Sequence, residues 1–386
     1  MAKSQAKSKP IVGVVKTSPD NVIDDYYRLL ELAEMEKYVS KNIKTALKLN
    51  LSWSLYYPAC STEPWQLEGV LNSLKMHGYK KNKVTAVENQ TVVTNPWKGA
   101  YGNKWNPILK KYQIPYKPLT DVKWIKYKPK SKMLAMTHLF GEIYVPQLYM
   151  GSNVIHFPTI KTHGHTITTG AMKNAFGGLI PRYRHHAHKM LDEVLVDLLI
   201  IQKEIHPGIF AVMDGTVAGN GAGPRTMEPF IGNTIIASND QVAIDAVSAK
   251  IMGFDPMKIP YIKIAHDKGL GMGDVDQIEI AGMGRKEFNK LNFHFETKKS
   301  PIIQWDQRIR KGTSNIHWLH KFLFHSPFFK SFIFASEFYH DKLWYPTIGK
   351  SKINAFNKTE WGQLFEKYSY GPKPKSIKVS GQWDPY

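Results

Sequence analysis

The sequence predicts an α/β protein with a two-lobed, mostly parallel, Rossmann-like sheet and a basic, aromatic-rich C-terminal module. Apolar runs alternate with helical segments, as in strands joined by crossover helices. Apolar residues make up 42% of the 386 residues, which is enough for a large core. From Arg285 onward, 18 Lys/Arg stand against 8 Asp/Glu among many aromatic residues. We therefore expect a disordered basic tail (1–10), an α/β domain (11–284) and the C-terminal module (285–386).

The first half of the α/β domain alternates strands with helices. The first helix has apolar residues at helical spacing, and the second opens at Pro64 and closes at Gly78, as a C-terminal glycine favours. The predicted strands are 11–17, 45–53 and 83–89, and the predicted helices are 21–39 and 63–76. This order is typical of parallel strands with crossover helices.

The second half repeats the pattern after a loop-rich stretch. Asp240 is expected to cap one helix, and Asp214 to end a strand before a glycine-rich loop, GTVAGNGAGP. The predicted strands are 153–162, 208–215, 233–240 and 278–282, and the predicted helices are 168–176, 185–205 and 241–253.

The overall charge points to acidic partners. The formal net charge is +20 and the pI is about 9.6, so phosphate- or carboxylate-bearing ligands, anionic lipid and nucleic acid are all attracted. The lone cysteine, Cys60, excludes internal disulfides and an iron–sulfur cluster held by this chain. With no signal peptide and no long apolar run, we expect a cytoplasmic protein, with peripheral membrane contact as an option.

A histidine-rich run, residues 161–189, is the strongest local signal. Histidine carries protons near neutral pH, so His163 and His165 are predicted to be catalytic. Neutral imidazoles also bind divalent metals, which makes His185 and His188 the candidate ligands of a metal cofactor. The alternative is a set of partly buried histidines held by hydrogen bonds.

The same run supplies contacts for an anion, because ligands of α/β proteins bind where strands end and helices begin. The predicted ligand- or cofactor-binding residues are Lys161, Lys173, Thr169 and Asn174. Asp214, at another strand end, is predicted to be a catalytic residue that orients the ligand or balances its charge. The alternatives are surface lysines exposed to solvent and an aspartate that opens a turn.

Four segments together resemble the domain-of-unknown-function family 362. They are KTHGHTITTGAMKNAFG, AVMDGTVAGNGAGP, NDQVAIDAVSAKIMGFDP and GLGMGDVDQIEIAG, and the likeness covers about residues 40–283. Many members of that family carry a cysteine-rich, ferredoxin-like segment. This chain has a single cysteine, so the resemblance implies no cluster-based electron transfer here.

The spacing of His163 and Lys173 also resembles a motif of the nickel-pincer lactate racemase family. That likeness implies that His163 acts as an acid or base and that Lys173 contacts a cofactor or anion. It also implies that His185 or His188 ligates a metal. Ala171-Met172 stands here in place of that motif's paired glycines.

Residues 317–346 interleave phenylalanine and tryptophan with lysine, and Pro327 interrupts any single helix. They could pack as a helical hairpin on the domain or contact an anionic membrane surface. Nucleic acid ranks lower, since no recognised binding motif is present.

The first functional hypothesis is an isomerase- or oxidoreductase-type enzyme. It would transfer protons on an acidic or phosphorylated small molecule, with a metal as a candidate cofactor. The second is a non-catalytic protein that binds polyanions or membrane surfaces through its C-terminal module.

Overall fold

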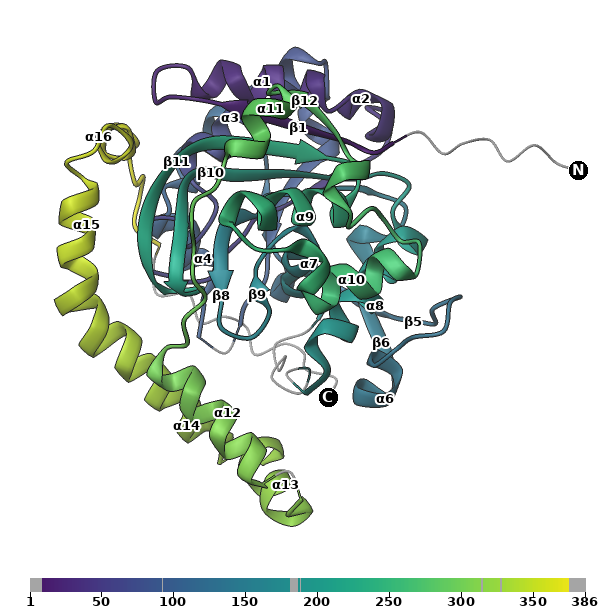
Figure 1. Cartoon of the computed structure of the whole chain (residues 1–386), viewed down its shortest axis with the longest axis vertical. Coiled ribbons are helices and arrows are strands. Elements are labelled where there is room, and N and C mark those ends of the chain that lie inside the picture. Colours follow the sequence, from purple (N-terminus) through teal and green to yellow (C-terminus); the bar gives the residue numbers. More distant parts are fainter. Residues whose placement is uncertain are drawn as a thin grey trace, which may run out of the picture.

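The computed structural model describes residues 9–91, 93–180, 187, 189–313, 315–326 and 328–374. An α/β domain carries a helical C-terminal module (Figure 1). Residues 1–8 of the predicted basic tail lie outside the described residues.

One sheet of ten strands runs through the domain, and most of its neighbouring pairs are parallel. The main order is β12-β1-β11-β10-β7-β2-β3-β4, and β8 and β9 branch from β10. The strands are β1 (Ile11–Lys16), β2 (Thr45–Lys48), β3 (Val84–Glu88), β4 (Tyr116–Pro118), β7 (Asn153–His156), β8 (Thr159–His163), β9 (Ile167–Thr168), β10 (Ile209–Ala222), β11 (Thr226–Ser238) and β12 (Glu279–Gly282). The predicted α/β class and mostly parallel sheet are confirmed.

Helices cover both faces of the sheet because successive strand residues point to opposite sides. Ala46 belongs to the apolar cluster on one face and Leu47 to the cluster on the other. The first face carries α7 (Ala171–Leu179), α8 (Leu191–Ile205), α9 (Gln241–Met252) and α10 (Pro260–Asp267). The second face carries α1 (Val22–Leu32), α3 (Pro64–Met76) and α5 (Trp105–Tyr112). The other α-helices and strands described in the domain are α2 (Met35–Tyr38), α4 (Pro96–Gly102), β5 (Trp124–Tyr127), α6 (Met136–Phe140) and β6 (Ile143–Pro146), and short 3-10 helices lie between some of the elements.

Three strand predictions need correction. The strand predicted over 45–53 ends at Lys48, and the one predicted over 153–162 is two strands, β7 and β8. GTVAGNGAGP is mostly strand rather than loop, because β10 continues to Ala222 as an antiparallel partner of β11. Its glycines permit close packing, since a Cβ on Gly219 would lie 2.4 Å from the Met227 sulfur.

Two helix predictions were misplaced at their starts. The helix predicted over 168–176 is α7, which begins at Ala171, and the one predicted over 185–205 is α8, which begins at Leu191. The helix predicted over 241–253 is confirmed as α9. Its Asp240 cap accepts hydrogen bonds from the backbone amides of Val242 and Ala243, at 2.9 and 3.0 Å.

The C-terminal module is helical over most of its described length. Its helices are α11 (Arg285–Lys290), α12 (Pro301–Thr313), α13 (His317–His325), α14 (Phe329–Glu337), the π-helix η7 (Phe338–Gly349), α15 (Lys350–Phe356) and α16 (Glu360–Lys367). None of the helices in the described ranges combines the length and hydropathy that a bilayer-spanning segment requires.

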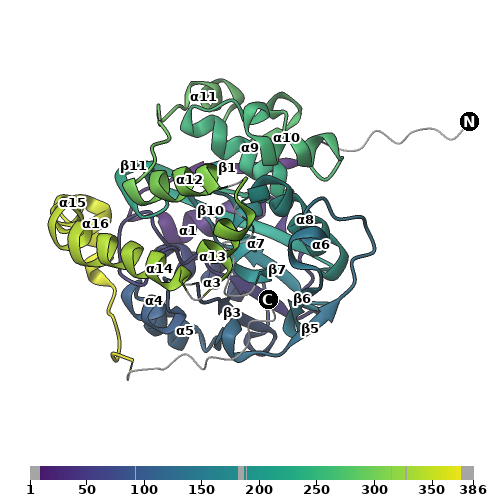
Figure 2. The ribbon, with the colours of Figure 1, turned by 90° about the horizontal axis from the view of Figure 1, so that it is seen from below.

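The last part of the module is anchored to the domain. The ring of Phe365 stacks on Tyr56 at 3.7 Å, and Trp361 donates a hydrogen bond to Asn233 at 2.6 Å. Trp53 donates to Asp341 at 2.7 Å. Helices α12, α13 and α14 instead extend beyond the sheet (Figure 1) and cross in front of the domain when it is seen from below (Figure 2).

Candidate functional site

Three neighbouring parallel strands end in polar residues that the fold brings together. Lys48 is the last residue of β2, Glu88 of β3 and His156 of β7. Lys48 lies directly opposite His156 in the sheet register. The carboxyl ends of parallel strands form one edge, where ligands of α/β proteins bind. These side chains therefore meet at the edge where a functional site is expected.

Lys48 and Glu88 form a buried ion pair at this edge. Their nitrogen and oxygen lie 2.8 Å apart, and the side chains are only 1% and 3% exposed. Lys48 also donates to the carbonyl of Leu49 at 2.6 Å, and Glu88 Oε1 accepts from the backbone amide of Asn89 at 2.7 Å. Glu88 Oε2 is buried and has no hydrogen-bond partner among the described residues. It therefore remains an acceptor for a donor group supplied by a ligand.

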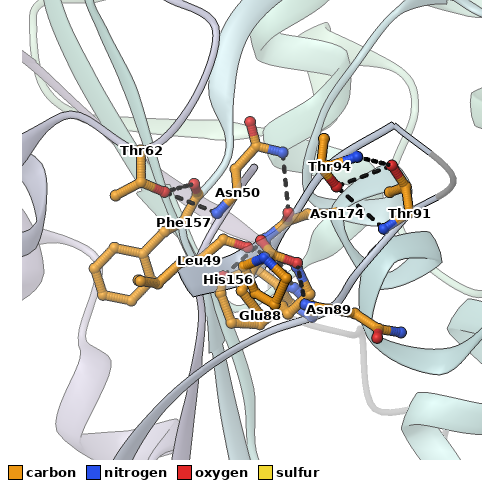
Figure 3. A network of polar contacts seen from close by, with 12 residues as sticks. Leu49, Asn50, Thr62, Glu88, Asn89, Thr91, Thr94, His156, Phe157 and Asn174 are labelled. Carbon is orange, nitrogen blue, oxygen red and sulfur yellow. Dashed lines mark hydrogen bonds and ion pairs between the residues drawn. The ribbon is translucent and has the colours of Figure 1, made fainter. Parts of the chain in front are cut away.

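Asn174, on α7, links the strand ends (Figure 3). Its amide donates to the carbonyl of Lys48 at 2.9 Å and lies 3.4 Å from His156 Nδ1. Its oxygen accepts from Asn50 at 3.3 Å. Burial lowers the pKa of His156 to about 3, so its ring is neutral near pH 7. The predicted binding residue Asn174 is thus at the centre of the network.

Helix α7 is held in place by a carboxylate of the chain itself. Asp245 accepts hydrogen bonds from the backbone amides of Ala171 at 2.6 Å and Met172 at 3.1 Å. Burial raises the pKa of Asp245 to about 7. Thr169, the predicted anion contact, instead bonds through its amide to the carbonyl of Lys161 at 3.0 Å. The N-terminus of α7 is therefore filled by Asp245, which fixes the position of Asn174.

His163 and Lys173 lie in contact with each other. Lys173 Nζ is 3.0 Å from His163 Nε2, while the backbone amide of His165 donates to His163 Nδ1 at 3.1 Å. An accepting Nδ1 puts the proton of the neutral ring on Nε2. The side-chain nitrogens of His163, on β8, and Lys173, on α7, therefore lie within hydrogen-bond distance of each other.

His165 completes this group. Its ring centre lies 5.7 Å from that of His163, and its Nδ1 is 3.2 Å from the side-chain amide of Gln307 on α12. Burial lowers the pKa of His165 to about 4, so the ring is neutral near pH 7. The two predicted catalytic histidines thus lie side by side beneath the C-terminal module.

A cavity of about 620 Å³ lies between the domain and helices α12 and α14. We call its polar side the floor and its apolar side the wall. The floor comprises Lys48, Asn50, Glu88, His163, Lys173 and Asn174. The wall includes the apolar side chains of Ile302, Ile309, Phe328, Phe329, Phe332 and Ile333. The Asp306–Arg310 ion pair of α12 also lines the cavity on this side. His165 and Arg225 also line the cavity.

Two other predicted site residues lie deeper in the protein. Lys161 is buried and donates to Asn50, Cys60 and Thr159 at 2.6–2.7 Å. Burial lowers the pKa of Lys161 to about 8. Lys161 therefore holds Asn50, a residue of the floor, in place.

Asp214 is not among the residues that line this cavity. It is fully buried and accepts hydrogen bonds from Tyr26 at 2.6 Å, Trp65 at 3.2 Å and the Thr216 hydroxyl at 2.7 Å. Burial raises the pKa of Asp214 to about 6. These contacts join β10 to α1 and α3 on the opposite face of the sheet.

The predicted metal ligands His185 and His188 lie outside the described residues. Within the described ranges, the one cluster of metal-type side chains consists of Glu31, Glu36 and His77. Both carboxylates are about half exposed, and Lys41 pairs with Glu36. This cluster is a surface ion-pair group separate from the cavity.

Lys48, Asn50 and His156 are floor or network residues that the sequence analysis missed. The strand over 45–53 was predicted too long, which placed Lys48 and Asn50 in its interior. Because β7 and β8 were predicted as one strand, His156 was not recognised as the last residue of a strand. The usable signal was a polar residue at the end of each short apolar run: Lys48, Glu88 and His156.

The structure shows an α/β protein with a cavity at its strand ends, and comparison with known proteins gives the family. Residues 45–250 match the family described as Domain of unknown function (DUF362). Because this match covers more than half of the chain, the protein belongs to that family.

A thylakoid-associated protein of Synechocystis sp. (strain ATCC 27184 / PCC 6803 / Kazusa) is 27% identical over 176 residues. The match covers 44% of this chain and 52% of the relative, so the chain spans about half of that protein's length. No solved structure matches the chain significantly.

Proposed function

We propose that the protein is an enzyme that moves a proton on an acidic or phosphorylated small molecule bound at the cavity floor. The observation that carries this proposal is the contact between His163 and Lys173 beside the buried Lys48–Glu88 pair, with all four residues lining one cavity. In this proposal the two nitrogens share one proton, and the pair accepts a second proton from the substrate and later returns it.

The surroundings suit an acidic substrate. Arg225 adds positive charge to the cavity lining, whereas the charges of Lys48 and Glu88 compensate each other. Glu88 Oε2 accepts a hydroxyl or amine hydrogen of the substrate, which orients the carbon that loses its proton. Lys173 Nζ releases its hydrogen bond with His163, takes the proton from that carbon with its lone pair and becomes an ammonium ion, which stabilises the negative charge left on the substrate. Return of a proton to the carbon completes an isomerisation with no co-reactant.

Solvent-deuterium exchange tests this reaction without knowledge of the natural substrate. The full chain is incubated in D2O with carboxylic acids and phosphate monoesters that bear a C–H bond beside a carbonyl group. Mass spectrometry then detects deuterium in any compound that reacts. We expect His163→Ala and Lys173→Met to slow the exchange by about 100-fold or more.

The matched control is His138→Ala, because His138 is exposed on α6 and does not line the cavity. It should exchange deuterium at the wild-type rate. Equal rates in wild type and His163→Ala would contradict the proposal.

We propose a second, compatible role: binding to an anionic membrane surface through the C-terminal module. Trp318, Phe334 and Trp305 are 73%, 68% and 66% exposed. Exposed lysines lie among the aromatic side chains, at Lys321 and Lys330. Aromatic rings enter the interfacial region of a bilayer while lysines attract anionic headgroups. The Synechocystis relative is named as a thylakoid-associated protein, which supports testing this chain for membrane binding.

Vesicle sedimentation tests this role. The protein should bind vesicles of phosphatidylglycerol and phosphatidylcholine, and the binding should weaken as salt is raised. The double variant Trp318→Ala/Phe334→Ala should bind less, whereas Met76→Ala should not, because Met76 is a similarly exposed apolar residue on α3. Equal binding of the two variants would exclude the module as the membrane contact.

A further inference from the structure

The cavity has two chemically different sides, and the proposed reaction uses only one. The floor comes from strand ends and α7, whereas the wall comes from α12 and α14. The apolar wall side chains Phe329 and Phe332 lie 6.1 Å apart, ring centre to ring centre, and Phe332 also stacks on Phe324 at 5.7 Å. The wall is therefore a packed apolar surface that faces polar groups across one space.

A small polar acid would satisfy the floor but leave the wall in contact with water. Burying apolar surface is favourable by roughly 25 cal/mol per Å², so a ligand with a hydrocarbon part gains affinity at the wall that a short acid does not. A cavity of about 620 Å³ is also within the range of roughly 300–1,000 Å³ typical of sites for ligands larger than a short acid.

The polar end of such a ligand is defined by the floor. Arg225, which lines the cavity in addition to the floor residues, favours a negative charge. Glu88 Oε2, which has no hydrogen-bond partner among the described residues, favours a hydroxyl or amine hydrogen. The exposed aromatic residues of α13 and α14 lie beside the wall on the same helical module. A ligand with a hydrocarbon chain is concentrated in membranes, the surface that these residues suit.

We propose that the cavity binds a single-chain amphiphile, with a carboxylate or phosphate head group at the floor and a hydrocarbon chain against the wall. This inference rests on the proposed function, because it places the acidic group of the substrate beside His163 and Lys173. It adds the substrate class: an acidic lipid rather than a water-soluble acid.

A fluorescent fatty acid, dansyl-undecanoic acid, is the direct probe, used with the full chain and no turnover. We expect saturable binding at one site per chain, seen as increased dansyl fluorescence. Dodecanoate and dodecyl phosphate distinguish a carboxylate head group from a phosphate, and the natural class should displace the probe better. Dodecanol, which lacks the acid, and inorganic phosphate, which lacks the chain, should each displace it at least tenfold less effectively.

Two neighbouring phenylalanines on α14 give a matched pair of variants. Phe332 lines the cavity, whereas Phe334 is 68% exposed and does not line it. Phe332→Ser should weaken probe binding by about tenfold or more, and Phe334→Ser should leave it within about twofold. Ser331→Phe is a second test, because Ser331 is an exposed residue that lines the cavity. A phenylalanine there should fill part of the cavity and weaken probe binding without removing apolar packing.

The outcomes separate this inference from the proposed function. Absence of saturable binding, or equal loss in Phe332→Ser and Phe334→Ser with no loss in Ser331→Phe, would overturn the amphiphile site. If short acids still exchange deuterium in a His163-dependent manner, the proposed reaction survives that result. Conversely, probe binding that depends on Phe332, without any His163-dependent exchange, would retain the site and reject the reaction.

Discussion

Replacing Lys48 with methionine tests whether the Lys48–Glu88 pair is as buried as described. Methionine fills most of the lysine volume but removes the charge that compensates Glu88. Breaking a buried ion pair from one side costs about 3–5 kcal/mol, because the remaining charge is left without its partner in a medium of low dielectric constant. The side chains of this pair are 1% and 3% exposed and lie 2.8 Å apart, so Lys48→Met should lower the free energy of unfolding by about 3–5 kcal/mol. Urea unfolding followed by tryptophan fluorescence measures the loss.

Two further variants make the result specific. Lys48→Met/Glu88→Gln removes both charges and should recover at least half of the lost stability. Lys263→Met, on a pair with Asp267 whose side chains are both 53% exposed, should lose no more than about 1 kcal/mol. If Lys48→Met is as mild as Lys263→Met, the pair is not a buried element of the cavity floor, and the reasoning fails.

Three other predictions concern residues that hold the site and the C-terminal module in place. Gly170→Ala should destabilise the protein by about 2 kcal/mol or more in urea unfolding, since a Cβ there would lie 2.1 Å from the Asp245 carboxylate; unchanged stability would refute the close contact. The pKa of His156 is lowered to about 3. The stabilisation that comes from keeping the His156 ring neutral is therefore complete above the unfolded-state pKa of about 6.5 and is lost as the pH falls towards 3. His156→Gln should flatten this fall in the free energy of unfolding at acid pH, and an unaltered fall would contradict the role of His156. Phe365→Ala should lower stability by about 3 kcal/mol and speed proteolysis of α15 and α16, because Phe365 is buried against Tyr56; equal cleavage rates would show that this contact is no anchor.

The alternation of strands and helices could be predicted from the sequence because it follows from the spacing of apolar residues. Capping residues such as Asp240 and Pro64 fixed helix starts correctly, since their preference is local. The continuation of β10 through its glycine-rich residues could not be predicted in this way. Its strand character depends on pairing with β11, and glycine otherwise indicates a turn.

The candidate site was predictable only in part, for a related reason. One short histidine-rich run of sequence contains His163, His165, Lys173 and Asn174. All four residues line the same cavity, and Asn174 also joins the hydrogen-bond network of the strand ends. Lys48 comes from a strand more than a hundred residues earlier and carries no local motif. Its role depends on the parallel register that places it opposite His156. The part of the cavity formed by α12 and α14 could not be predicted from the sequence either, because an apolar helix face does not indicate which surface it will cover.

The proposed sharing of one proton by His163 and Lys173 is the central claim, and nitrogen NMR of labelled histidine rings tests it directly. At neutral pH we expect His163 to carry its proton on Nε2, with an unprotonated Nδ1, and expect Lys173→Met to shift the Nε2 signal. The His138 signals should be unchanged by that substitution. A doubly protonated His163 ring, or a proton on Nδ1, would contradict the account.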